Sequence, residues 1–188
     1  MKTLTLALFT ALLCTTALAQ HQTFTINPDA STVAFTLGGH DTTNGTFRVT
    51  KGEVHFDPAS PHLSGLIDVS AASGTSGNAT RDKKMLNDVL QASQFADVTF
   101  APQTYTGTLT PTGDSTLQVT GIFTLHGTPH TITVPLQLHI DGSRCTARAH
   151  FTVPYVQWGL KDPSIFILKV AKAVDINLTL IGFLAPTP

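Results

Sequence analysis

The chain has 188 residues, of which 41% are hydrophobic and only 12% are charged. Its formal net charge of −1 excludes the broad positive field with which proteins attract nucleic acid or acidic lipid. The length predicts a single domain that is large enough to bury a stabilising core.

Residues 1–19 have the features of a secretory signal peptide. A positive charge at Lys2 precedes an apolar run over residues 4–13, and a small-x-small cleavage sequence ends at Ala19. The apolar run is too short to remain as a transmembrane anchor. We therefore expect an exported protein, periplasmic or secreted, with a mature domain of residues 20–188 and no stable membrane insertion.

The two cysteines do not predict a disulfide. Cys14 would leave with the signal peptide. A lipoprotein signal would use Cys14, but Leu13 before it is not the small residue that such signals prefer. Cys145 then remains alone in the mature chain. On a strand, a lone cysteine is more often a small buried hydrophobic residue than a reactive thiol.

Alternation of apolar and polar residues predicts β-strands along most of the mature chain. The clearest pattern covers residues 117–140, where two alternating runs flank a Gly/Pro-containing break at 126–130 and predict a hairpin. The other strand-like runs are 24–26, 33–37, 47–56, 63–69, 95–100, 105–110, 144–153 and 174–180. Pro135 cannot donate to a strand ladder, so it predicts a bulge or a partly open seam.

One part of the chain lacks the strand pattern. Residues 71–78 are small and polar, which predicts a loop. Residues 81–91 have one apolar stripe and predict a helix, with Asn78 or Thr80 as its N-cap. The stripe consists of Met85, Leu86, Val89 and Leu90.

Eight to ten short strands with frequent turns and one helix are typical of a β-sandwich or a β-barrel. The residues expected to face inward are rich in phenylalanine, whereas threonine dominates the opposite face. Periodicity does not distinguish a barrel filled by side chains from one that encloses a ligand. From the residues alone, an ordinary packed core is the more common arrangement.

Several short motifs occur in a defined order between residues 22 and 184, and no single one of them is specific. They are Val33-Ala34-Phe35, His40, Gly45-Thr46-Phe47, Asn78 with Arg81-Asp82, Phe95 to Phe100, Gly121 with Leu125-His126-Gly127, and Trp158-Gly159-Leu160 with Val174-Asp175-Ile176. Together they resemble the YceI-like family. The resemblance implies a single lipocalin-like antiparallel β-barrel with one short helix near its mouth, and an apolar tunnel for a polyisoprenoid or similar long-chain lipid.

The resemblance favours a lipid-lining role for the inward side chains over a packed core. Apolar contact is non-directional and would select a guest by length and shape. The predicted lining residues are Val33, Phe35, Phe47, Phe56, Phe100, Phe123, Leu125, Ile132, Val134, Phe151 and Ile176.

Four polar residues near strand ends or the helix start are candidates for holding the lipid headgroup. They are His40, Arg81, Asp82 and His126. A guanidinium suits a phosphate or a carbonyl, and a helix N-terminus favours an anion. Equally, Arg81 and Asp82 could be a pair that fixes the loop before the helix.

No nucleophile elbow, phosphate loop or metal-ligand motif is present in the sequence, so we expect a non-enzymatic protein without cofactor or metal. Two alternatives remain open: a hydrolytic or metal-assisted enzyme, and a packed β-domain that binds a protein partner through its surface or residues 158–167. The expected partner is a long-chain lipid and not nucleic acid. The oligomeric state stays open, with a dimer among the options.

Overall fold

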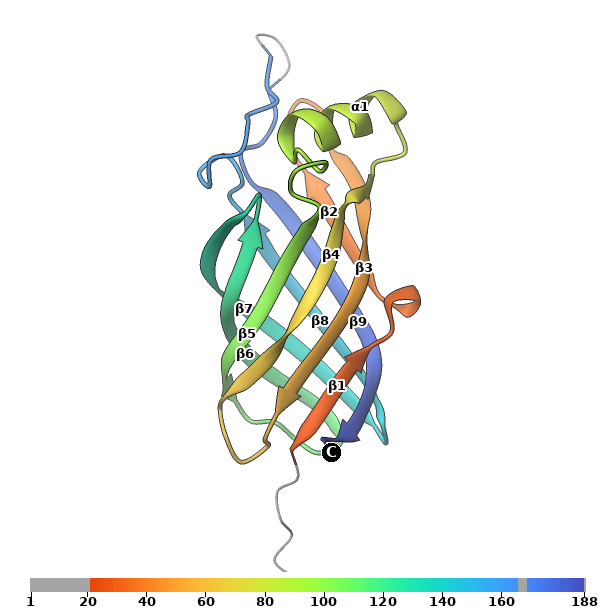
Figure 1. Cartoon of the computed structure of the whole chain (residues 1–188), viewed down its shortest axis with the longest axis vertical. Helices are drawn as coiled ribbons and strands as arrows, with labels where there is room; N and C mark the ends of the chain where they lie inside the picture. Colours follow the sequence, from red (N-terminus) through yellow and green to blue (C-terminus); the bar gives the residue numbers. More distant parts are fainter. Residues whose placement is uncertain (1–20, 166–168, 188) are drawn as a thin grey trace, which may run out of the picture.

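Antiparallel strands make up most of the protein in a computed structural model that describes residues 21–165 and 169–187 (Figure 1). The predicted signal peptide, 1–19, lies outside the described residues. The nine strands of the described part are β1 (Gln22–Ile26), β2 (Thr32–Leu37), β3 (Thr43–Phe56), β4 (Leu63–Thr75), β5 (Asp97–Gly107), β6 (Gly113–Leu125), β7 (Thr128–Asp141), β8 (Arg144–Val153) and β9 (Val174–Pro186).

The sheet closes on itself and forms a barrel, as predicted. The order β2-β9-β8-β7-β6-β5-β4-β3 is completed by the antiparallel pairing of β3 with β2. Both β1 and β2 pair with β3 and β9, so together they occupy one of the eight strand positions around the barrel. The short 3₁₀ turn η1 (Pro28–Ala30) separates them, and the Asn27 side chain accepts from the backbone N–H groups of Asp29 and Ala30.

The predicted hairpin is β6 and β7, which pair without a register shift along their whole length. His126 and Gly127 form its two-residue turn with φ of 52° and 72°, as a tight hairpin turn requires. Several strands are longer than the sequence pattern indicated, because the irregular positions within β3 and β5 are register shifts and not strand ends.

Pro135 marks a partly open seam, one of the two outcomes predicted for it. Its ladder with β6 continues through Gln118 without a bulge. On the other side, β7 pairs with β8 only over 136–141. Residues 128–135 therefore have no described strand partner on the side of β8, and a residue without an N–H group is tolerated there. We call this gap the β7–β8 seam.

The predicted loop at 71–78 is wrong for its first half, because β4 continues to Thr75, which pairs with Thr46. The small residues reflect close packing. A Cβ added at Gly74 would clash with the Phe47 ring and lie 2.8 Å from Met85 Cε. The small residues of this stretch predicted a loop, whereas in the fold they leave room for larger side chains such as Phe47.

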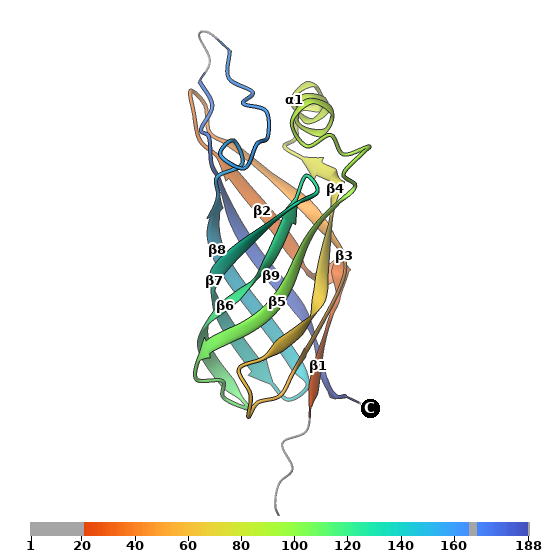
Figure 2. The ribbon, with the colours of Figure 1, turned by 60° about the vertical axis from the view of Figure 1, so that its left-hand side comes forward.

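The predicted helix, 81–91, is two short pieces. Helix α1 (Ala79–Lys84) begins after Asn78, whose side chain accepts from the Arg81 N–H at 3.0 Å. It continues into a π-helical turn, η2 (Met85–Val89). Figures 1 and 2 place α1 at the end of the barrel opposite the C-terminus, and we call this the helix end. Among the described residues, no helix is long and apolar enough to cross a membrane.

Candidate functional site: an apolar cavity inside the barrel

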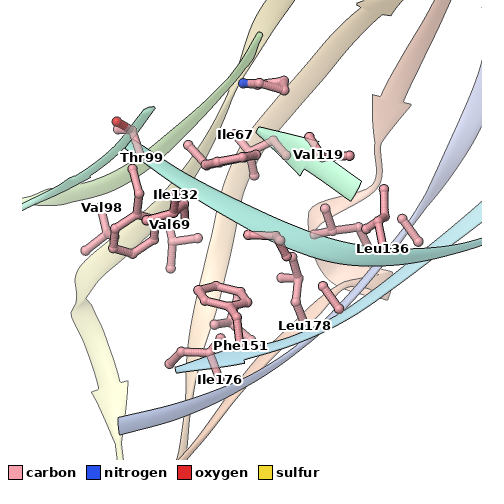
Figure 3. A pocket seen from close by; sticks show the side chains of 18 of the residues that line it. Ile67, Val69, Val98, Thr99, Val119, Ile132, Leu136, Phe151, Ile176 and Leu178 are labelled. Carbon is pink, nitrogen blue, oxygen red and sulfur yellow. The ribbon is translucent and has the colours of Figure 1, made fainter. Parts of the chain in front are cut away.

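A cavity of about 280 Å³ lies inside the barrel, with lining residues from all nine strands. It is nearly twice the size of the ~150 Å³ cavities that stay dry and bind benzene. Figure 3 shows Ile132, Phe151 and Ile176, from three different strands, converging on one space. No charged side chain lines it. The inward face is therefore an apolar wall around a space.

The structure places every predicted tunnel residue on this cavity. These residues are Val33, Phe35, Phe47, Phe56, Phe100, Phe123, Leu125, Ile132, Val134, Phe151 and Ile176. Alternation identified them because every second residue of a strand faces the same side of the sheet. Their contact with a lipid remains a prediction.

Aromatic rings border the cavity, and glycines on neighbouring strands accommodate them. Phe123 and Phe151 meet edge to face with ring centroids 6.2 Å apart. A Cβ added at Gly121 would lie 2.8 Å from Cζ of Phe100. Glycines within strands often mark such close approaches. Glycines within the predicted strands could therefore have indicated where aromatic rings pack, which the alternation of apolar and polar residues does not show.

The lining at the helix end comes partly from outside the sheet, and the prediction did not include these residues. They are Met85, Val89 and Leu90 from η2 and its C-cap, and Tyr155 and Leu160 from the segment after β8. The apolar stripe of the predicted helix was the signal that could have identified the first group. This part of the wall lies outside the nine strands, and backbone hydrogen bonds such as that from the Ala171 N–H to the Gly38 carbonyl tie the segment after β8 to the β2–β3 turn.

The segment after β8 also covers the β7–β8 seam. Trp158 stacks on His130 of β7 with ring centroids 3.9 Å apart and an interplanar angle of 7°. The indole lies 5.8 Å from the ring of Phe123, which lines the cavity. His130 Nε2 is buried and has no hydrogen-bond partner among the described residues. Tyr155 anchors the same segment by donating to the Ala171 carbonyl at 2.7 Å.

The four predicted headgroup residues do not line the cavity. His40 is exposed on the β2–β3 turn, and its backbone N–H donates to the Lys169 carbonyl at 2.8 Å. The His126 ring packs on Phe95, and its Nε2 lies 3.0 Å from Gln91 Oε1. Both histidines therefore have local partners on the surface.

Arg81 and Asp82 both bind the turn that precedes α1. Asp82 accepts from the Ser76 N–H at 2.8 Å and from the Thr75 hydroxyl at 3.0 Å, and it also accepts from the Ser76 hydroxyl. Arg81 Nε donates to Ser76 Oγ at 2.8 Å. This geometry supports the alternative in which the pair fixes the loop. A headgroup role for any of the four residues remains a prediction.

Replacing Asp82 by asparagine should lower the melting temperature slightly and leave lipid occupancy unchanged. Hydrogen bonds, above all from the Ser76 hydroxyl, lower the pKa of Asp82. The carboxylate therefore contributes stability above its unfolded pKa, and this contribution is lost as pH falls through its lower folded pKa. Thermal melts at neutral and acidic pH test this, because the difference between wild type and variant should shrink in acid. Lost lipid occupancy with an unchanged melt would instead support the headgroup role.

Cys145 is a buried hydrophobic residue, as predicted, with 3% of its surface exposed. Burial raises the pKa of its thiol from 9.0 to about 11. Since the thiolate is the nucleophile, a water-soluble maleimide at neutral pH should label the folded protein at least about tenfold more slowly than the unfolded chain. Between these two pKa values only the unfolded chain releases the proton, so stability should fall as pH rises through that window.

A Cys145→Ala variant is the control for this labelling experiment. It should remain unlabelled, and it should lose the part of the alkaline destabilisation that comes from ionisation of the Cys145 thiol in the unfolded chain. Rapid labelling of the folded wild type would show that water reaches the cavity wall on β8.

Among the described residues, no group of three or more histidine, cysteine or acidic side chains lies close enough to hold a metal ion. The polar side chains of the lining are confined to Thr99, Tyr105, Cys145 and Tyr155. Burial and the nearby Asp162 carboxylate raise the pKa of Tyr155 to about 12, so this phenol is neutral at physiological pH. The lining therefore offers hydroxyl and thiol groups and no charged side chain of its own.

A closed antiparallel sheet around an apolar interior defines a lipocalin-like barrel. Residues 24–181 match the family model described as the YceI-like domain, and the chain belongs to this family.

Known relatives and solved structures agree with this assignment. The chain is 30% identical over 152 residues to a UPF0312 protein of Pseudomonas fluorescens, covering 77% of this chain and 75% of the relative. The structure of BcnA from Burkholderia cenocepacia superposes with a TM-score of 0.67 at 23% identity, covering 84% of this chain and 99% of that one. A polyisoprenoid binding domain from Saccharophagus degradans, implicated in plant cell wall breakdown, gives 0.69 at 15% identity, covering 87% and 98%. These structural likenesses show the shared fold.

Proposed function

We propose that this protein binds a polyisoprenoid or similar long-chain lipid inside the barrel and carries or stores it. The observation that supports this proposal best is the cavity, which has lining residues from every strand and no charged side chain. Burial of a hydrocarbon chain there contributes about 25 cal/mol per Å² of apolar surface. Each added isoprenoid unit extends that contact without any new polar partner.

The family supports the choice of ligand. A structure with the same fold is described as a polyisoprenoid binding domain. The lining provides few hydrogen-bonding groups, so the hydrocarbon tail would dominate recognition and the polar end would lie near an opening. Shielding of the tail from water is then the whole mechanism.

Carriage of a lipid fits the cavity better than catalysis does. Acid–base chemistry requires a titratable group within hydrogen-bond reach of the reacting atom. No histidine, aspartate, glutamate or lysine lines the cavity. The signal-like segment at 1–19 supports export, so the proposed site of action is the periplasm or the medium.

Native mass spectrometry of the protein purified from its own host, without detergent, tests the proposal. We expect one lipid per barrel, and extraction should yield a long-chain molecule, with a polyisoprenoid as the first candidate. Delipidated protein should take up the same lipid again. Protein that is repeatedly found empty and takes up neither isoprenoid nor acyl chains would overturn the proposal.

A further inference from the structure

One imidazole nitrogen is buried beside the cavity without a hydrogen-bond partner. Less than 1 Å² of His130 Nε2 is accessible to water, and no atom of the described residues bonds to it. Among the buried side-chain nitrogen and oxygen atoms in the described part of the chain, only this one is unpaired. Burial of a polar atom without a partner costs free energy, and folded proteins contain few such atoms. The described chain therefore provides no compensation for the burial of this nitrogen.

His130 belongs to the inward face of β7, next to residues that line the cavity. Ile132 and Val134 are part of the lining, and the period of two of a strand places His130 on the same face. On β6, the residue paired with His130 is Phe123, which also lines the cavity. Directly opposite residues of an antiparallel pair have neighbouring side chains. The imidazole therefore borders the apolar cavity.

The same residue lies at the β7–β8 seam. On that side β7 pairs with β8 only from Leu136 onward, so no strand covers His130 there. The indole of Trp158 covers it instead and stacks on the imidazole almost in parallel, at an interplanar angle of 7°. A stacked ring covers the face of an imidazole, whereas the hydrogen bond of a ring nitrogen lies in the ring plane. The indole therefore does not replace the missing hydrogen-bond partner.

The surroundings of His130 suit an uncharged ligand group better than an anion. No lysine or arginine lines the cavity, and the hydroxyl of Tyr155, which does, already donates to the Ala171 carbonyl. A phosphate needs charge-assisted hydrogen bonds, and a buried anion without them is very costly. A hydroxyl needs a single partner. It both donates and accepts, so it can bond to Nε2 in either tautomer of the imidazole.

We propose that His130 Nε2 binds a terminal hydroxyl of the lipid at the β7–β8 seam, while the hydrocarbon chain extends into the cavity. This site rests on the proposed function and specifies the ligand as a long-chain alcohol. Nε2 is closed off in the structure, so a side chain has to move before the hydroxyl reaches it. Rotation of the Trp158 indole opens the seam without breaking any strand pairing, because β7 and β8 have no ladder there.

Competition binding to delipidated protein tests the site with geranylgeraniol and with the same molecule lacking its hydroxyl group. Each displaces a fluorescent isoprenoid, and the ratio of the two affinities measures what the hydroxyl contributes. In His130→Phe the alcohol-to-hydrocarbon affinity ratio should fall about fivefold, because a hydrogen bond is lost while an aromatic ring still faces Trp158. His130→Gln, which keeps a hydrogen-bonding group, should recover part of the ratio. Use of a ratio cancels general changes in the cavity.

The matched control is His139→Phe, the same substitution on the exposed face of the same strand. Its affinity ratio should equal that of wild type. In protein with ¹⁵N-labelled histidine, the Nε2 resonance of His130 should shift with the alcohol and much less with the hydrocarbon. This measurement needs no substitution, so it tests the site even if His130→Phe does not fold.

An affinity ratio that His130→Phe leaves unchanged, or that falls equally in His139→Phe, would overturn the site. Tighter binding of geranylgeranyl phosphate than of geranylgeraniol would also overturn it, because the preferred polar end would then be charged. The two proposals can fail separately. Wild type that binds both chains with a ratio independent of His130 contradicts only the hydroxyl site, whereas wild type that binds neither chain contradicts the proposed function as well.

Discussion

Replacing Ala149 by phenylalanine is expected to lower the affinity for the bound lipid by at least tenfold while the barrel still folds. Ala149 is 8% exposed and lies on β8, where it lines the cavity two residues before Phe151. A benzyl group at this position would occupy space that the lipid needs. A tenfold loss corresponds to about 1.4 kcal/mol, which is the free energy of burying roughly two methylene groups. Titration of delipidated protein with a fluorescent isoprenoid measures the effect.

The matched control is Arg148→Phe, which adds the same ring to the exposed face of the same strand. It should bind lipid like wild type. The melting temperature of Ala149→Phe distinguishes an open cavity from a packed core, because overpacking a filled core costs about 1–3 kcal/mol. A strongly destabilised Ala149→Phe protein, with wild-type lipid affinity in the folded fraction, would contradict the cavity-based proposal.

Replacing Trp158 by alanine is expected to destabilise the barrel by about 2 kcal/mol, less than the roughly 3–5 kcal/mol for a fully buried tryptophan because Trp158 is half-buried, and to accelerate lipid release. The indole stacks on His130 and contacts Phe123, and it covers the β7–β8 seam, where no ladder joins the two strands. Without it, the imidazole loses its stacking partner and water gains access to the side of the cavity. Denaturant unfolding measures the stability, and transfer of a fluorescent lipid to acceptor vesicles measures the release rate.

Trp158→Phe is the control, since it keeps an aromatic ring against the imidazole. It should recover most of the stability and slow release again. If Trp158→Ala had the stability of wild type and released lipid at the same rate, the segment after β8 would have no closing role. Faster release with unchanged stability would show that the seam controls access without contributing to folding.

The strands and their inward faces could be read from the sequence because alternation has a direct structural meaning. Val119, for example, lies between the polar residues Gln118 and Thr120, and the period of two of a strand places it on the face opposite to theirs. Pro135 indicated a gap in pairing for an equally local reason, the absence of an N–H group. Closure of the sheet into a barrel, however, came from the family resemblance and not from the periodicity.

The polar candidates show where reasoning from the sequence was weakest. His40 and His126 lie at turns, as expected, but their ring and backbone partners lie on the surface. Asp82 is engaged by Ser76, which the sequence did not single out. Where a polar side chain at a turn points depends on the local path of the chain, and residue order carries little information about that.

The sequence by itself determined that this is a strand-rich domain with a continuous apolar face, because each strand records its inward side in every second residue. Only the tertiary structure decided that this face encloses a space, because the width of the interior depends on how strands curve and stagger around the ring. Only the tertiary structure likewise shows which residues cover the helix end and the β7–β8 seam. η2 and Trp158 lie between strands in the sequence, and only folding decides that Met85 of η2 reaches Gly74 of β4 and that Trp158 reaches His130 of β7.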